Sequence, residues 1–269
     1  MMSGIMNTET TTIDNRITRL FKSGKKNLLN IYFTAGFPNL EDTIPIIKAL
    51  EKSGADIVEI GMPYSDPLAD GPTIQESSTR ALKNGMSINK LFEQLAQIRK
   101  EVSIPIILMG YLNPVLQYGI EKFCEKAAEV GVDGFILPDL PMAEYEEFYK
   151  NIFIKNQLSN IFLVTPQTSD SRLKKIDELS DGFIYAVSSD STTGNNKNLK
   201  DAESYFKKLK AANLKNPIMI GFNINDHSSF SYACQYAEGG IIGSAFIKML
   251  SKSKDLESDI PKFIRFIKG

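Results

Sequence analysis

The sequence predicts one α/β domain folded as a (β/α)8 TIM barrel, and three observations support this fold class. The chain has 269 residues, which is a usual size for such a barrel. Eight short apolar segments alternate with longer amphipathic segments almost to its end. No linker or change of composition divides them. A doubly wound open sheet is the alternative, but Thr34-Ala35-Gly36-Phe37-Pro38 after the first strand lacks the glycine-rich fingerprint typical of that fold.

The predicted strands consist mostly of β-branched and aliphatic residues without polar alternation, which is typical of strands buried on both faces. They cover residues 28–35, 57–60, 104–109, 135–137, 160–165, 183–187, 217–221 and 240–243. Between them, apolar residues recur three and four positions apart, as in amphipathic helices. Examples are Leu40, Ile44, Ile47 and Leu50 after the first strand, and Leu91, Leu95 and Ile98 after the second. Glycine or proline marks most of the joins.

The first twelve residues do not follow the barrel pattern. Residues 1–12 are polar and rich in threonine, without the basic and then apolar order of a signal peptide. We expect a disordered tail over residues 1–12, followed by a barrel domain over residues 13–269 that begins with an extra N-terminal helix. No segment approaches the roughly 20 apolar residues of a membrane span. A cytoplasmic location is therefore expected, without a membrane partner.

Charge and chemistry-bearing residues exclude several classes of function. The 31 basic and 32 acidic residues leave a net charge of −1, so the chain has no electrostatic footprint for nucleic acid. Its two cysteines, Cys124 and Cys234, are too few for a disulfide framework, and we expect buried, reduced thiols. The single histidine, His227, follows Asn225-Asp226 in a predicted first helical turn and is expected at the surface. A structural zinc site is disfavoured.

The second strand carries a charged residue inside a predicted core. In a barrel, function belongs to the C-terminal ends of the strands. Because side chains alternate along a strand, Val58 and Ile60 suit the helix-facing side, and Glu59 then points into the barrel interior. Desolvation raises the pKa of such a carboxyl, as proton transfer near neutrality requires. The alternative is a salt bridge to Lys or Arg across the barrel.

The loop after this strand brings a second carboxylate. Prolines at 63, 67 and 72 restrict its conformations and lower the entropy lost on ordering. Asp70 follows Glu59 by eleven positions across a turn, so it can fold back over the barrel mouth. Two alternatives remain for this residue type: a solvated loop aspartate, and a divalent-metal site formed with Glu59.

Residues 59–75 closely resemble the tryptophan synthase α subunit family, whose pattern is roughly Glu-x-Gly-x-Pro-x-Ser-Asp-Pro-x-Ala-Asp-Gly-Pro-x-Ile-Gln. The resemblance extends over nearly the whole chain. It includes Thr34 to Pro38, Met109 to Pro114, Leu137 to Pro141 and Gly243 to Ala245. It implies retro-aldol cleavage of indole-3-glycerol phosphate into indole and glyceraldehyde 3-phosphate, with Glu59 and Asp70 as the catalytic pair.

The chemistry implied by the resemblance accounts for both carboxylates. Indole is a poor leaving carbanion, so the ring carbon that bears the side chain must be protonated first. Glu59 can donate that proton and assist removal of the side-chain hydroxyl proton. Asp70 can accept a hydrogen bond from the indole N–H and stabilise the developing positive charge. No metal or organic cofactor is expected on this chain.

The resemblance also implies a substrate pocket. It assigns substrate contacts to Thr193 and Gly194 in the loop after strand six and to the pocket residue Tyr185. Tyr32 and Tyr111 are expected to border the indole, with core packing as the alternative reading. Phosphate binding is expected from backbone N–H groups after strands seven and eight, where an ordinary helix cap is the alternative. The residues there are Phe222, Asn223, Gly243 and Ser244.

Two departures from the family pattern lie in this pocket. The loop reads Ser191-Thr192-Thr193-Gly194, where many members have Gly-Val-Thr-Gly. After strand seven, Asn223 stands where the family usually has glycine, although asparagine tolerates positive φ better than most residues.

The resemblance implies a partner as well. This is a pyridoxal-phosphate-dependent β subunit, in an α2β2 heterotetramer in which indole passes to the partner through a tunnel. Pro63, Tyr64 and Asp66 match positions near that contact. Two alternatives are a stand-alone lyase that releases free indole and a non-catalytic barrel that regulates its partner.

Overall fold

The computed structural model describes residues 12–188, 202–221 and 223–269, and its centre is a parallel sheet. The strands are β1 (Leu28–Thr34), β2 (Ile57–Gly61), β3 (Ile106–Met109), β4 (Gly134–Ile136), β5 (Ser159–Asn160), β6 (Leu163–Val164), β7 (Ile184–Val187), β8 (Ile218–Gly221) and β9 (Gly239–Ile242). Their order is β5-β4-β3-β2-β1-β9-β8-β7-β6. Because only two residues separate β5 from β6, the two ends of this order are joined and the sheet closes on itself.

The joint between β5 and β6 lies within the segment predicted as one strand over residues 160–165. The Ile161 N–H donates to the Phe135 carbonyl of β4, whereas the Phe162 carbonyl accepts from the Tyr185 N–H of β7. The segment thus exchanges one neighbour for the other at this point. Counted as one interrupted strand, it leaves eight strands in the described ranges, and the predicted (β/α)8 barrel is confirmed.

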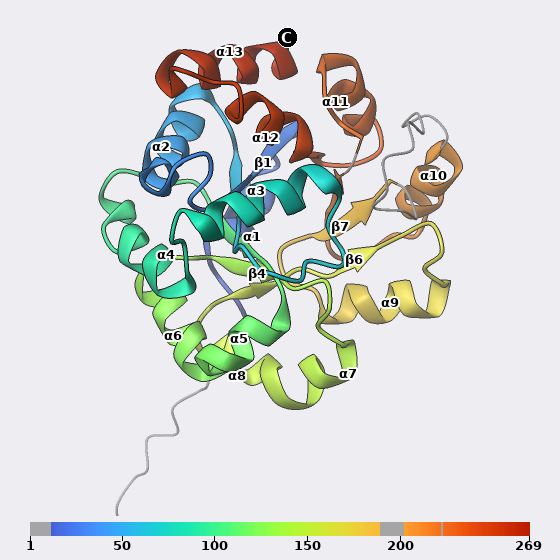
Figure 1. Cartoon of the computed structure of the whole chain (residues 1–269). Coiled ribbons are helices and arrows are strands. Elements are labelled where there is room, and N and C mark those ends of the chain that lie inside the picture. Colours follow the sequence, from blue (N-terminus) through green and yellow to red (C-terminus); the bar gives the residue numbers. More distant parts are fainter. Residues whose placement is uncertain (1–11, 189–201, 222) are drawn as a thin grey trace, which may run out of the picture.

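Helices surround the strands (Figure 1). The α-helices are α1 (Arg16–Lys22), α2 (Thr43–Ser53), α3 (Pro72–Lys83), α4 (Ile88–Leu95), α5 (Leu112–Tyr118), α6 (Ile120–Glu129), α7 (Met142–Glu144), α8 (Lys150–Lys155), α9 (Asp170–Leu179), α10 (Glu203–Ala211), α11 (His227–Cys234), α12 (Ser244–Leu250) and α13 (Leu256–Lys268). Short 3-10 turns occupy η1 (Leu40–Asp42) and η2 (Ile98–Lys100), and η3 (Tyr145–Tyr149) is a π-helical turn between α7 and α8.

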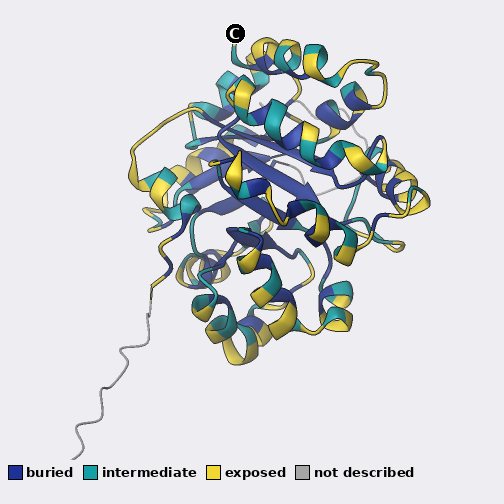
Figure 2. Cartoon of the chain, turned by 90° about the vertical axis from the view of Figure 1, so that its left-hand side faces the viewer, coloured by how far each residue is buried: buried dark blue, intermediate teal, exposed yellow. Residues whose placement is uncertain are grey.

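The strands are buried almost throughout, as Figure 2 shows, and only Met109 of β3 and Leu163 of β6 are partly exposed among the strand residues described. One face packs against the helices, and Val58 and Ile60 of β2 belong to that core. The other face fills the barrel interior. Its residues include Leu28, Ile57, Ile107, Ile136, Phe183, Met219 and Ile241. The predicted division of β2 is confirmed, because Ile57 lies in the interior and its alternation partner Glu59 shares that face.

The extra N-terminal helix α1 lies across the N-terminal ends of the strands. Its Ile17 is fully buried and joins the interior core. Asn15 caps the helix by accepting from the Ile17 and Thr18 N–H groups, and its amide donates to the Asp133 carbonyl at 2.8 Å. The buried Asp133 carboxylate forms ion pairs with Arg16 at 3.0 Å and with Arg99 at 2.6 Å. The helix therefore closes the barrel at the N-terminal ends of its strands.

Other expectations concern single residues and the tail. Cys124 in α6 is buried and Cys234 in α11 is partly buried, and both are free thiols. His227 begins α11 after the capping Asp226 and is exposed, as predicted. The expected tail lies outside the described residues, except for Thr12. Within the described ranges, no helix is long and apolar enough to cross a membrane, and no three His, Cys, Asp or Glu residues gather as a metal site would require.

Candidate active site

Glu59 lies in the upper part of the barrel interior, only 1% exposed. In the register of β1 and β2 it stands opposite Tyr32, with Asn30 two residues below on the same face. Its hydrogen-bond partner is the Asn30 amide, whose Nδ2 donates to Oε2 at 2.8 Å, and not the Lys or Arg of the salt-bridge alternative. Burial raises the pKa of Glu59 to about 8, the Asn30 hydrogen bond opposes this, and the negative charge of Asp70 adds to it.

Asp70 folds back over the barrel mouth from the loop between β2 and α3. The Tyr111 hydroxyl donates to its Oδ2 at 3.0 Å and accepts the Ala69 N–H at 2.9 Å, so one side chain fixes both the carboxylate and the backbone beside it. Pro72 opens α3 directly after this loop. Burial raises the pKa of Asp70 to about 6, and the Tyr111 hydrogen bond opposes the rise. Asp70 is therefore not a freely solvated aspartate.

Two tyrosines lie across neighbouring strands because those strands carry glycine. A Cβ at Gly61 of β2 would collide with the Tyr32 hydroxyl, and a Cβ at Gly221 of β8 would collide with that of Tyr185. Both rings are buried, and burial is the main cause that raises their pKa values well above the usual range. The charges of Asp70 and Glu59 contribute to both shifts, which places the two rings and the two carboxyl groups within electrostatic reach of one another.

A small cavity joins several of these residues. It is lined by Tyr32, Met62, Asp70, Ser78, Met109, Gly110, Tyr111 and Pro138. Tyr32, Asp70 and Tyr111, which are far apart in the sequence, thus share one enclosed space at the C-terminal ends of the strands. This is the end of the barrel where catalytic side chains are expected.

The residues expected at the phosphate end are partly described. Asn223 has φ of 58°, a left-handed conformation that asparagine adopts more readily than most residues. Gly243 precedes α12 and lies against the Tyr32 ring, since a Cβ there would be 3.3 Å from Tyr32 Cδ1. Ser244 is the exposed first residue of α12. Thr193, Gly194 and Phe222 lie outside the described residues.

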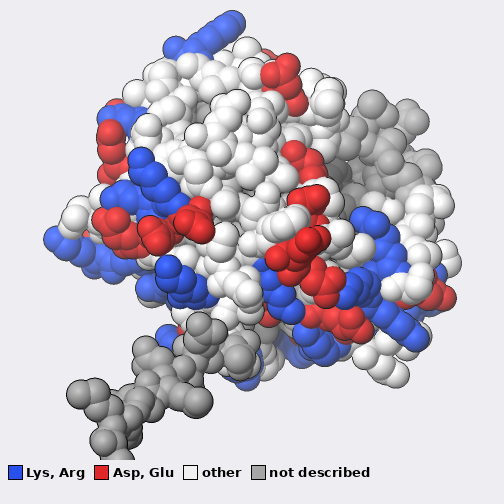
Figure 3. Space-filling view, turned by 90° about the horizontal axis from the view of Figure 1, so that it is seen from below, with Lys and Arg blue, Asp and Glu red and all other residues white. Residues whose placement is uncertain are grey.

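The predicted interface residues lie on the same loop as Asp70. Pro63 and Tyr64 are partly exposed, and Asp66 is exposed. The Tyr64 ring lies 5.3 Å from that of Tyr111, and its hydroxyl accepts from the Asn113 amide at 3.2 Å. Leu68, further along the loop, is 91% exposed. The face that carries α5, α7 and α8 has its charges gathered over one half, while the other half is largely uncharged (Figure 3).

Sequence reasoning missed Asn30, Gly61 and Gly221. The signal for Asn30 was present, because it is the one amide within the apolar run Leu28-Leu29-Asn30-Ile31 of a strand expected to be buried on both faces. Gly61 is a fixed position of the family pattern and Gly221 ends a predicted strand, but the sequence gives no structural reason for either glycine. Their importance depends on which side chain of the neighbouring strand crosses them.

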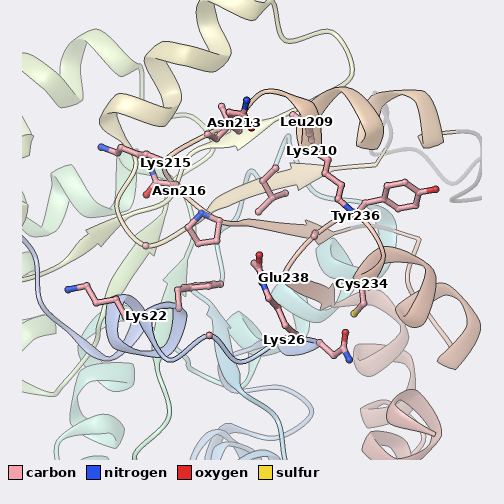
Figure 4. Close-up of a pocket in the computed structure, with 18 of the residues that line it drawn as sticks. Lys22, Lys26, Leu209, Lys210, Asn213, Lys215, Asn216, Cys234, Tyr236 and Glu238 are labelled. Carbon is pink, nitrogen blue, oxygen red and sulfur yellow. The ribbon is translucent and has the colours of Figure 1, made fainter.

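A second, larger hollow lies at the opposite end of the barrel (Figure 4). Its lining includes Lys22, Lys26, Lys210 and Lys215. Lys26 is paired with Glu238, which lies beside it in Figure 4, and Lys210 donates to the Gln235 carbonyl. This hollow surrounds the N-terminal ends of β8 and β9, whereas the cavity beside Asp70 lies at the C-terminal ends of the strands. The cavity beside Asp70 is therefore the candidate active site.

Comparison with known proteins gives a consistent result. A family model described as Tryptophan synthase alpha chain matches residues 18–268. The tryptophan synthase alpha chain of Flavobacterium psychrophilum is 56% identical over 251 residues, which cover 93% of this chain and 98% of the relative. That of Bacteroides thetaiotaomicron is 50% identical over 249 residues, which cover 92% and 97%.

Solved structures agree with the sequence relatives. Tryptophan synthase subunit alpha from Legionella pneumophila superposes with a TM-score of 0.86 at 34% identity, covering 95% of this chain and 97% of the other. A chain of tryptophan synthase from M. tuberculosis, in its aminoacrylate-bound form, gives 0.83 at 29% identity, covering 95% and 98%. The likeness therefore covers the barrel as a whole.

Proposed function

This chain belongs to the tryptophan synthase alpha chain family, and from that membership we propose how its two carboxyl groups cleave indole-3-glycerol phosphate. Membership makes it a lyase of tryptophan biosynthesis that catalyses the alpha reaction. The observation that supports the proposal most is the difference between the pair: the pKa of Glu59 is raised to about 8 and that of Asp70 only to about 6. At neutral pH, Glu59 is then mainly an acid and Asp70 mainly an anion.

Asp70 is assigned to the indole ring. Tyr111 binds its Oδ2, and Oδ1 is the oxygen that we assign as acceptor of the indole N–H. A fixed carboxylate at this point stabilises the positive charge that appears on the ring when its carbon is protonated. The rings of Tyr32 and Tyr111 border the same cavity and suit a planar apolar ligand.

Glu59 is assigned to both proton transfers. Its protonated carboxyl gives a proton to the ring carbon that bears the glycerol phosphate chain, and the resulting carboxylate accepts the proton of the adjacent side-chain hydroxyl. The bond between ring and side chain then breaks. Its electron pair returns to the ring to form indole, while the hydroxyl carbon becomes the aldehyde of glyceraldehyde 3-phosphate. Glu59 ends protonated, so the cycle closes without a cofactor on this chain.

The phosphate end is proposed to lie at the backbone N–H groups of Gly243 and Ser244, with Asn223 beside them. Gly243 contacts the Tyr32 ring, so this end of the substrate would be adjacent to the indole cavity. The proposed set includes Thr193, Gly194 and Phe222 from the segments outside the described residues.

A tryptophan synthase β subunit is the proposed partner. The relatives are named as the alpha chain of tryptophan synthase, and one neighbour was solved in an aminoacrylate-bound form of that enzyme. We propose that the partner binds the loop that carries Pro63, Tyr64 and Asp66, in an α2β2 heterotetramer, and that it alone carries pyridoxal phosphate. The exposed Leu68 on the same loop fits such a contact.

The test uses the full chain with indole-3-glycerol phosphate, alone and with a β subunit. Glu59→Gln and Asp70→Asn are each expected to lower turnover by about 10²- to 10⁴-fold while circular dichroism stays unchanged. Turnover of Glu59→Gln near the wild-type level would contradict the mechanism. High activity that the partner does not alter would identify the stand-alone lyase, and a wild-type chain that cleaves nothing would identify the regulatory barrel.

A further inference from the structure

Asn30 occupies an unusual place for an amide. It lies on the interior face of β1, fully buried, and stands opposite Ile57 in the register with β2. The interior layer at this depth is apolar and includes Ile57, Ile107, Met219 and Ile241. A buried amide costs folding free energy unless it is hydrogen-bonded. Among the described residues, its Nδ2 donates to Glu59, while its buried Oδ1 has no partner.

The hydrogen bond from Asn30 reaches only one of the two carboxyl oxygens of Glu59. Oε2 accepts from Asn30 Nδ2 at 2.8 Å, whereas Oε1 is buried and has no hydrogen-bond partner among the residues that the structure describes. Rotation about the terminal torsion of glutamate is intrinsically broad, so a carboxyl without such a bond would not keep one orientation. Asn30 therefore distinguishes a held oxygen from a free one.

We propose that Asn30 is the positioning residue for the acid–base group of this enzyme: it holds Oε2 from below and so presents Oε1 to the substrate as the oxygen that gives and takes the proton. This inference rests on the proposed role of Glu59 and deepens it. It also gives a reason for an amide in an apolar layer, since a purely structural position there would be served by an aliphatic side chain.

Asn30 has a second effect on the same group. In the described part of the chain, the ionisable groups within electrostatic reach of Glu59 are Asp70 from the loop after β2, Tyr32 from β1 and Tyr185 from β7. Burial and Asp70 raise the pKa of Glu59, and the N–H donated by Asn30 lowers it because it stabilises the charged form. Without Asn30, the carboxyl would be a weaker acid as well as a mobile one.

The test compares Asn30→Leu and Asn30→Ala with the wild type in the full chain. Leucine keeps the branching of asparagine without its N–H, and alanine covers the case in which leucine is too large to pack. The matched control is Asn160→Leu, because Asn160 is a buried asparagine on β5 whose Nδ2 has no hydrogen-bond partner among the described residues. Cleavage of indole-3-glycerol phosphate is measured as kcat and KM between pH 5 and 10, and folding by thermal unfolding.

For both Asn30 variants we expect kcat to fall about ten- to a hundredfold with little change in KM, and the alkaline limb of kcat to move to higher pH. Asn160→Leu is expected to keep the wild-type profile. Carbon-13 NMR of glutamate-labelled protein, with the Glu59 signal assigned from Glu59→Gln, should show a higher Glu59 pKa in Asn30→Leu, independently of activity.

The possible failures can be told apart. A folded Asn30→Leu with wild-type kcat, pH limb and Glu59 pKa would overturn the role of Asn30 while an inactive Glu59→Gln leaves the proposed function standing. Equal loss in Asn30→Leu and Asn160→Leu would assign a structural role only and would also overturn the inference. If wild-type protein shows no cleavage, the proposed function fails. The NMR titration then still tests the hydrogen bond by itself, because an unchanged Glu59 pKa in Asn30→Leu would show that Asn30 does not act on Glu59.

Discussion

At the scale of single residues, the site uses one chemical group, the carboxyl, for two purposes. Both carboxyl groups are desolvated, but Glu59 receives its bond from an amide deep inside the barrel, while Asp70 receives one from Tyr111 at the mouth. Their environments separate their pKa values, and this separation assigns acid and anion. The alternation of side chains along the strand is enough to predict that Glu59 lies inside the barrel. The sequence alone does not show which of the two carboxyl groups has the higher pKa, because that depends on the contacts with Asn30 and Tyr111.

The pH dependence of turnover should be bell-shaped. Activity requires ionised Asp70, so it should rise as pH increases through about 6, and it requires protonated Glu59, so it should fall as pH increases through about 8. The measurement is kcat against pH with saturating indole-3-glycerol phosphate. A rate that keeps rising above pH 9 would mean that protonated Glu59 is not the acid.

Removing the Tyr111 hydroxyl should affect Asp70 specifically. Tyr111→Phe removes a hydrogen bond to a charged group, for which a loss of about ten- to a hundredfold in kcat/KM is expected. Because that bond lowers the pKa of Asp70, the acidic limb should also move to higher pH. Tyr118→Phe is the matched control, since the Tyr118 ring packs on Phe92 and Phe123 away from the cavity. An unmoved acidic limb in Tyr111→Phe would show that Asp70 is held by other groups.

The buried acid should also lower stability at alkaline pH. The pKa of Glu59 is raised from 4.5 to about 8 on folding, so the folded state binds more protons between these values, and stability is lost as pH rises through that range. Glu59→Gln removes this loss. Urea unfolding should therefore show the variant gaining stability over wild type at pH 9 compared with pH 5. An equal difference at both pH values would contradict the raised pKa.

At the scale of elements, much of the barrel can be predicted because its strands are apolar on both faces, whereas its helices are apolar on one face only. Each predicted strand lies within a few residues of the observed one, including the one interrupted between β5 and β6. The departures are at contacts between distant segments. The exchange of neighbours at Ile161 and the passage of Tyr32 over Gly61 depend on tertiary register, which no local pattern encodes.

The closure of the barrel by α1 should depend on Asp133. This carboxylate is 1% exposed and binds Arg99, Arg16 and the Ile106 N–H. Asp133→Ala leaves the largely buried Arg99 without its carboxylate, so the free energy of unfolding should fall by about 3 kcal/mol. Urea denaturation measures this change. The control is Asp14→Ala. This change removes an exposed ion-pair partner of Arg19, which also lies on α1, and should leave the midpoint unchanged. Similar midpoints for both variants would show that α1 is held by apolar packing alone.

At the scale of the whole molecule, the proposed partner surface and the active site are one continuous structure. Tyr64 on the loop packs against Tyr111, and Tyr111 holds Asp70. A partner that fixes this loop would therefore fix Asp70 through two side chains. The conformational restriction from the loop prolines favours this coupling, because less entropy is lost when the loop is ordered.

Leu68 separates docking from chemistry, since it is 91% exposed and lines no part of the cavity beside Asp70. Leu68→Asp places a charge in an apolar contact, so the affinity for a tryptophan synthase β subunit should fall by about tenfold or more.

The turnover of the variant alone should match that of the wild type. Any increase in turnover that the partner causes should require a higher partner concentration. The measurements are titration calorimetry and cleavage of indole-3-glycerol phosphate over a range of β-subunit concentrations. Lys90→Ala, on the exposed side of α4 beside Glu93, is the control and should leave both curves in place. If Leu68→Asp binds the partner as the wild type does, the docking surface does not include this loop tip, and the coupling through Tyr64 and Tyr111 loses its starting point.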